Sequence, residues 1–393
     1  MTDGTLFSRN ISPSSDQPEA KVVIFPTHKT KRVVTMGGHL LHPENPSDSS
    51  PALPDDPLNR SSQASQLPPL HSVDVQMVLN GRNLSQQNLR LANFRRLDLR
   101  QTDFQSADLY SANLQEADLR CSNFSNAEME EADLSLSNLS NARLVGTQLS
   151  YALLYTANLS SANLLHATMT HADLREADFH KANLQKANLS NSNLSYADCG
   201  RCDMSFAQMV HVNLRESVLR HAKGCSSNLR LANMLRVDLS KSDLSDADLM
   251  GANLQSASFY EACLVNARLI GANMVRASFY SGDLTQANLN KVNAEGTTFS
   301  RAILTRASFV AAHLRAANFY SVEMSQANFQ RADLTAAILC DSNLEGADLR
   351  NAILKGANLR GASLRGADLR KADLTDVNLA DAHIEGAKFS HPT

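Results

Sequence analysis

The residues best suited to chemistry are a Cys-x-x-Cys motif, a set of histidines and a long series of Asp and Asn. Cys199 and Cys202 have the spacing of a redox pair or of half a metal site. No second motif of this kind completes four zinc ligands. The histidines converge on no serine or cysteine with an acid beside it, and no phosphate-binding glycine loop is present. We therefore expect no enzyme activity, no catalytic residue, no metal and no cofactor.

The Asp and Asn residues belong to a pattern with a period of five. From Leu84 to Phe389, every fifth residue is nearly always Leu, Phe or Met, and we call it the centre of a pentad. A small residue such as Ala107 stands two positions before the centre, and Asp or Asn stands one before. Because these polar residues recur in almost every pentad, we interpret them as turn supports that bond nearby backbone. One row predicts an amide ladder: Asn193, Asn213, Asn233, Asn253, Asn273 and Asn293.

A period of five fits neither a helix nor a flat strand. On a helix, apolar residues five apart would spread around the whole surface. In a strand, an odd spacing would send successive centres to opposite faces. The chain must therefore bend once per pentad so that every centre faces one axis. This geometry predicts stacked coils with a continuous core.

Pentads such as ANLQEADLR and GANLRGASLRGADLR resemble those of the pentapeptide-repeat family. The resemblance implies an all-β fold, a right-handed quadrilateral β-helix with four pentads per coil. The centre and the small residue two before it would point inward. One feature of the sequence supports four pentads independently, because Phe259, Phe279, Phe299 and Phe319 recur every 20 residues and would stack in one interior column.

The sequence divides into three parts. Residues 1–70 hold nearly all the prolines and few apolar residues, so we expect a mostly disordered arm. Within it, KVVIF and RVVTM could form a hairpin or a docking strand, or a sticky patch in a disordered arm. Residues 71–81 predict a capping helix, Val73 to Asn80, with Ser72 as N-cap. Residues 82–391 form the predicted solenoid. No apolar run is long enough for a membrane span, and with no signal pattern we expect a cytoplasmic protein.

Some pentads depart from the pattern at inward positions. Gly224 and Ala294 stand where a large centre is expected, and each would have a Met beside it in the same column. They indicate either compensated packing or a ligand cavity. Cys199 is a centre and Cys202 stands two before the next centre, so both should replace core residues. The other cysteines fall at outward or edge positions, which is typical of free thiols.

The outward residues after each centre suggest where a partner would bind. Most are polar, but in the third quarter of the chain they become apolar or aromatic. Tyrosine-rich and apolar exposed surfaces are typical of interfaces. The alternative is that Tyr and Val simply suit strands. The candidate partner surface consists of Tyr260, Tyr280, Tyr320, Met250, Ile270, Val310 and Leu235.

Charge separates the functional hypotheses. The formal net charge is −3 at pH 7, so the chain is nearly balanced and no direct binding of nucleic acid is expected. The leading hypothesis is a non-catalytic, rod-like scaffold for an unidentified protein partner. The alternative, which the resemblance brings, is a DNA-mimicking regulator or protector of gyrase, a type II topoisomerase, but a mimic needs a strongly negative face. The last coil predicts an unpaired edge, and a homodimer through the C-terminal end is possible.

Overall fold

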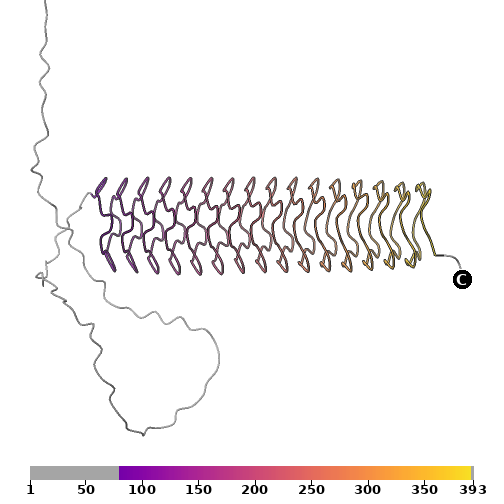
Figure 1. Cartoon of the computed structure of the whole chain (residues 1–393), viewed down its shortest axis with the longest axis horizontal. Helices are drawn as coiled ribbons and strands as arrows, with labels where there is room; N and C mark the ends of the chain where they lie inside the picture. The colour runs from indigo at the N-terminus through magenta and orange to yellow at the C-terminus, as the bar shows by residue number, and fades with distance from the viewer. Residues whose placement is uncertain (1–78, 391–393) are drawn as a thin grey trace, which may run out of the picture.

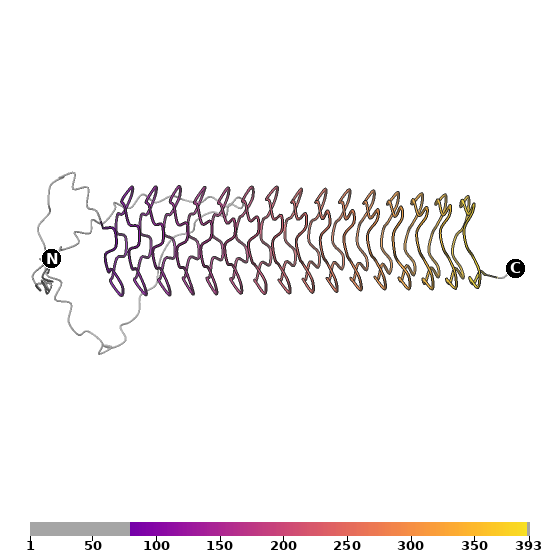
Figure 2. The ribbon, with the colours of Figure 1, turned by 90° about the horizontal axis from the view of Figure 1, so that it is seen from above.

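A computed structural model describes residues 79–390 of the 393-residue chain. In this range the chain winds into one continuous coil that stacks along a straight axis as a rod (Figures 1 and 2). It contains no helix and no strand longer than one paired residue. Instead, each side of each coil forms one parallel bridge to the next coil. The first bridge joins Asn83 to Asp103, and the last joins Asp368 to Lys388. About 15 coils at the usual strand spacing give a length of roughly 75 Å.

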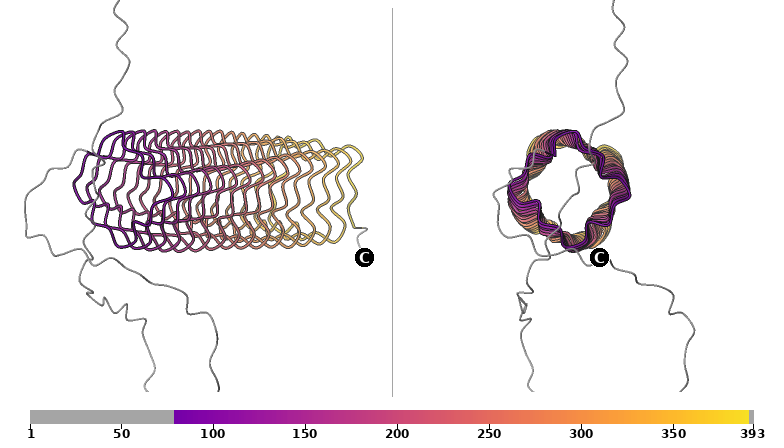
Figure 3. Two further views of the ribbon diagram at one scale, coloured as in Figure 1. Left: turned by 60° about the vertical axis from the view of Figure 1, so that its left-hand side comes forward. Right: turned by 90° about the vertical axis from the view of Figure 1, so that its left-hand side faces the viewer.

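The coil has four sides. Every bridge pairs a residue with the one 20 positions later, so four pentads complete one turn. Seen along its axis, the backbone is a closed ring (Figure 3). We name the sides A, B, C and D after their first regular centres, Leu84, Leu89, Phe94 and Leu99. The four-sided register predicted for a quadrilateral β-helix is confirmed.

Each corner of the coil is a tight turn that a second set of bonds holds in place. The amide of Ala92 donates to the carbonyl of Leu89 at 3.1 Å, and Leu91 between them has a φ of 59°. A positive φ at that position is the signature of a type II turn. Most residues at these corners are not glycine, which costs about 1–2 kcal/mol each. The stacked coil offsets this cost, because the Leu91 amide donates to the Tyr110 carbonyl at 3.0 Å.

Leucines, phenylalanines and alanines fill the interior. Centres and the small residues two before them are almost completely buried along the rod. The predicted phenylalanine column is confirmed: the Phe259 and Phe279 rings stack at 4.5 Å, Phe279 and Phe299 at 5.3 Å, and Phe299 and Phe319 at 4.9 Å. Phe309, from side B, meets the Phe299 ring edge-on at 5.8 Å. The third quarter of the rod therefore has an aromatic core.

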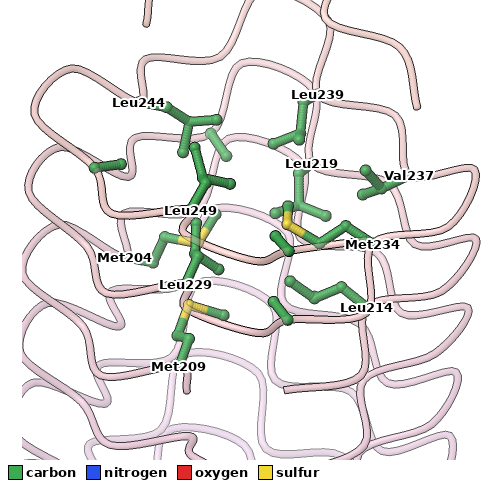
Figure 4. Close-up of a cluster of buried hydrophobic side chains, with 14 of the residues drawn as sticks. Met204, Met209, Leu214, Leu219, Leu229, Met234, Val237, Leu239, Leu244 and Leu249 are labelled. Carbon is green, nitrogen blue, oxygen red and sulfur yellow. The ribbon is translucent and has the colours of Figure 1, made fainter. Parts of the chain in front are cut away.

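The missing side chain at Gly224 leaves no usable space. A Cβ atom there would lie 2.7 Å from Cδ2 of Leu244 and 3.6 Å from Cγ of Met204. Figure 4 shows these two side chains in the buried cluster around this part of the axis. Neighbours in the same column have therefore filled the gap, which supports compensated packing and not a ligand cavity. Ala294 is likewise completely buried.

The coil extends at least one pentad further toward the N-terminus than the sequence pattern suggested. Leu79 is a buried centre, and its carbonyl accepts the Thr102 hydroxyl at 2.8 Å. Asn80 and Gly81 form the first turn, so the end of the predicted helix Val73–Asn80 is not helical. Gly81 donates to the Arg100 carbonyl as any corner residue does, which pulls this stretch into the coil. The rest of that helix and the predicted disordered arm 1–70 lie outside the described residues.

The last described coil is uncovered, as predicted. Within residues 371–390, the centres Leu374 and Leu379 are only half-buried. Ile384 and Phe389 are 47% and 37% exposed. Their counterparts in earlier coils are fully buried. Within residues 79–390, nothing packs over this end of the core.

Candidate interaction surfaces

The recurrent Asp and Asn side chains support the turns. The Oδ1 atom of Asn193 accepts the amide of Ser195 at 3.1 Å, and the same bond recurs in most pentads. Asn213 also donates its Nδ2 to Asn193 Oδ1 at 2.9 Å, and similar bonds continue to Asn273. The predicted amide ladder is therefore confirmed from Asn193 to Asn273. Because these oxygens accept hydrogen bonds from the backbone and from neighbouring side chains, they are poorly placed to act as general acids or bases.

The Cys-x-x-Cys motif is part of the core. Cys199 and Cys202 are 2% and 0% exposed, and the Cys202 amide closes the turn on the Cys199 carbonyl at 3.1 Å. Hydrogen bonding to Cys202 and burial raise the pKa of the Cys199 thiol well above its ordinary value. A neutral, enclosed thiol is neither a nucleophile nor a metal ligand. Among residues 79–390, no cluster of three His, Cys, Asp or Glu side chains is arranged to hold a metal.

The three predicted tyrosines form one column on side D, directly outside the phenylalanine column. Tyr260 and Tyr320 are 39% and 44% exposed, and Tyr280 is half-buried. The Tyr260 and Tyr280 rings stack at 5.8 Å with an interplanar angle of 6°. Ser300 fills the gap in the column and is nearly buried. Tyr260 and Tyr280 lie one coil apart, and Tyr320 lies two coils beyond Tyr280.

Side D carries no charge over this stretch. Ten outward residues from five successive coils of side D make up a surface that we name the tyrosine strip. They are Ser258, Tyr260, Ser278, Tyr280, Thr298, Ser300, Asn318, Tyr320, Ile338 and Cys340. Charged groups stand only at its margins. Lys241 Nζ lies 6.0 Å from the Tyr260 ring centroid and Arg301 Cζ lies 5.7 Å from that of Tyr280. The Glu261 carboxylate, which accepts the Tyr260 hydroxyl, raises the pKa of Tyr260.

The other four predicted residues do not join this strip. Met250, Ile270 and Val310 lie in one column on side B, across the core from side D, and Leu235 lies on side C. All four are half-buried. One partner face cannot contact all seven predicted residues at once. The tyrosine column differs from these four residues in its exposure, because Tyr260 and Tyr320 are exposed.

Sequence reasoning missed a second exposed surface, on side C near the N-terminal end. It consists of Leu136, Tyr151, Leu153 and Tyr155, and we name it the apolar patch. These residues are 58%, 58%, 39% and 38% exposed, respectively. The Leu136 amide donates to the Tyr155 carbonyl at 2.9 Å, so the two residues are neighbours in adjacent coils. The signal was visible in YALLY, because Leu153 replaces the usual Asp or Asn. The sequence search for a partner surface covered only the residue after each centre, and Leu153 stands before a centre.

Many of the charged residues elsewhere neutralise one another locally. Arg100, Arg350 and Arg370 each fold back on the Asp two residues earlier at 2.6 Å. The Arg370 guanidinium lowers the pKa of Asp368 to about 2, which keeps that carboxylate ionised. Paired charges of this kind produce no continuous negative face. In residues 79–390 there is also no helix of the length and apolarity that a membrane crossing requires.

Comparison with known proteins identifies the repeat. The family model for pentapeptide repeats matches successive segments from 79–115 to 352–390. No curated protein sequence is significantly similar to the chain. Among solved structures, HetL, a pentapeptide-repeat protein of the cyanobacterium Nostoc involved in regulating heterocyst differentiation, is 31% identical. The match covers 55% of this chain and 89% of HetL, with a TM-score of 0.31.

Two further structures are similar over shorter stretches. QnrB1, a plasmid-mediated fluoroquinolone resistance protein, is 19% identical over 46% of this chain and 90% of its own, with a TM-score of 0.27. A pentapeptide-repeat protein of the Arabidopsis thaliana thylakoid lumen is 32% identical over 26% of this chain and 68% of its own, with a TM-score of 0.21. The family model, which spans almost all of residues 79–390, decides the assignment. The chain belongs to the pentapeptide-repeat family.

Proposed function

We propose that the protein is a non-catalytic, rod-like scaffold that binds a protein partner through the tyrosine strip. The observation that carries this proposal is one column of tyrosines, two of them exposed and one half-buried, on a side of the coil whose ten outward residues include no charged group. Tyrosine offers a large apolar surface and a hydrogen-bonding hydroxyl at low entropic cost, which is why it dominates many interfaces. The absence of net charge lowers the desolvation cost of covering the strip.

The rigidity of the rod favours binding of this kind. The Tyr260 and Tyr280 rings stand on strands whose backbone bonds are complete and whose inner faces rest on Phe259 and Phe279. Little conformational freedom is therefore lost when a partner covers them. The strip extends over about 20 Å at the strand spacing, which suits one extended or flat protein surface.

We expect Tyr260→Ser with Tyr280→Ser to abolish partner capture while the fold stays unchanged. Two interface tyrosines of this type contribute about 2 kcal/mol or more, or roughly 30-fold in affinity. The test is quantitative mass spectrometry of the proteins that the full-length wild type and the variant retain from a lysate. Tyr110→Ser is the matched control, because Tyr110 also follows a centre but lies on side B, far from the strip. A partner retained equally by all three proteins would refute the site.

A DNA-mimicking regulator of gyrase is the less favourable alternative. It would require a face of closely spaced, unpaired carboxylates. Arginines pair with many of the outward aspartates, and the tyrosine strip has no carboxylate. A gyrase supercoiling assay separates the two functions, because a scaffold of the proposed kind leaves supercoiling unchanged.

We also infer that a second copy of the chain covers the open C-terminal coil. The support is the apolar surface at Ile384 and Phe389, together with the edges of the last coil, which pair with no later coil within residues 79–390. Sedimentation at tens of micromolar is expected to show a dimer, and Ile384→Asp to show a monomer. Ile353→Asp, at an outward position with similar exposure, should leave the dimer intact. A wild-type monomer at that concentration would contradict the inference.

A further inference from the structure

The apolar patch on side C is too exposed to be explained by packing within the rod. Leu153 and Tyr155 point outward from one strand, Tyr151 stands at the preceding corner, and Leu136 adjoins Tyr155 from the coil before. Tyr151 stacks on His171 at 4.8 Å, and the Tyr155 hydroxyl donates to Glu176 Oε1 at 3.3 Å. The Arg175 guanidinium also lies over the Tyr155 ring, 5.4 Å from its centroid. These contacts hold the rings in place, and Tyr151 and Tyr155 remain 58% and 38% exposed. A contiguous apolar surface of this kind is typical of a docking site.

Carboxylates border the patch on its N-terminal side. The preceding coil carries EMEEAD, with Glu130 and Glu131 next to the corner and Asp133 bridged directly to Leu153. Glu131 accepts the Ser111 hydroxyl and Asp133 is bonded by the Gln115 amide, both neutral groups. None of the ion pairs formed within residues 79–390 includes any of these three carboxylates. A complementary occupant would therefore present apolar side chains followed by positive charges.

The chain contains such a sequence. Residues 21–32 read KVVIFPTHKTKR, in which four apolar residues from Val22 to Phe25 precede Lys29, Lys31 and Arg32. The patch lies about 18 Å along the rod from Leu79 at the strand spacing. The residues between Arg32 and Leu79 reach up to about 150 Å when extended, so the tether does not prevent contact. Tethering also raises the effective concentration of the segment to about the millimolar range.

We propose that the segment Val22–Arg32 docks on the apolar patch of its own rod, with Val22–Phe25 over Leu153 and Tyr155 and the basic residues toward Glu130 and Glu131. The arm would then cover one surface of side C and leave the tyrosine strip of side D free. This inference concerns a different side and different coils from the proposed partner site. Either one can fail without affecting the other.

A single tryptophan reports on docking in the full-length protein. The sequence contains no tryptophan, so Phe25→Trp introduces a unique fluorophore at the apolar end of the segment. We expect its emission to be blue-shifted and shielded from iodide relative to the same protein in denaturant. Leu153→Asn should weaken docking about tenfold and return the emission toward that of exposed indole. The side C asparagine ladder shows that an amide fits this column without disturbing the fold.

Matched controls separate docking from a change in stability. Ile353 occupies the same pentad position as Leu153 on the same side, is 42% exposed and lies far along the rod. Ile353→Asn should therefore leave the emission of the tryptophan blue-shifted. Glu130→Gln with Glu131→Gln should weaken docking, whereas Glu295→Gln should not. Three results would overturn the proposal: an indole at position 25 that is fully exposed in the wild type, an equal response to Leu153→Asn and Ile353→Asn, or a blue shift that disappears on dilution and so reports docking between copies.

Discussion

Phe299→Ala is expected to destabilise the rod by about 3–5 kcal/mol. The Phe299 ring is completely buried between Phe279 and Phe319, and it also meets Phe309 edge-on. Its removal leaves a cavity that the stacked coils cannot close, because hydrogen bonds to the coils on both sides fix each strand. Denaturant unfolding followed by circular dichroism measures the loss. Hydrogen exchange should locate it in the coils that contain Phe279 to Phe319, because solenoid coils contact only their neighbours.

Phe206→Ala is the control for this prediction. Phe206 is the same residue type in the same solenoid, but it stands at a corner and is 55% exposed. Phenylalanine and alanine both have a Cβ, so the backbone at position 206, which has a positive φ, is equally strained before and after the substitution. Its substitution should change the free energy of unfolding by less than about 0.5 kcal/mol. Equal losses for the two variants would show that the phenylalanine column does not stabilise the rod as described.

Gly224→Leu is expected to destabilise the protein by about 1–3 kcal/mol, although it restores the residue that the repeat normally has. The variant loses stability because the Leu244 side chain already occupies the space: even a Cβ at position 224 would lie 2.7 Å from Leu244 Cδ2. The larger side chain must displace Leu244 or Met204 from the core (Figure 4). Unfolding in denaturant measures the effect.

A second substitution tests the cause of that loss. Leu244→Ala removes the side chain that now fills the position, so it is destabilising by itself. Combined with Gly224→Leu it should recover part of the lost stability, since the new leucine then occupies the vacated space. If Gly224→Leu raised the free energy of unfolding, the position would be a true gap and the description of the core would be wrong.

The inward half of this structure was predictable because a single constraint governs it. Every centre must face one axis, so the period of five leads to a bend per pentad. The family resemblance implied four sides, and the phenylalanines at a spacing of 20 supported that number. The same logic did not reveal that Leu79 is already part of the coil, since that pentad is followed by a glycine corner that resembles a helix end. Nor could it show that Leu244 and Met204 fill the place of Gly224, because that depends on side-chain positions in neighbouring coils.

The outward half was only partly predictable, because the core does not constrain it. The spacing places the three tyrosines in one column and Met250, Ile270 and Val310 in another, but it does not give the exposure that distinguishes Tyr260 and Tyr320. Leu153 was missed because its position normally holds the residue that supports the turn. Only the exposure of its neighbours Leu136 and Tyr151 shows that the substitution creates a surface. Adjacency between coils, more than residue type, defines the candidate sites.

Inward side chains specify the rod, and we propose that the tyrosine strip binds the partner. The most direct test is the affinity of the captured partner for the wild type and for the Tyr260→Ser, Tyr280→Ser variant, measured with the unfolding free energy of each. We expect roughly 30-fold weaker binding by the variant with little change in its unfolding free energy, because both side chains point outward. Equal affinity for the two proteins would contradict it.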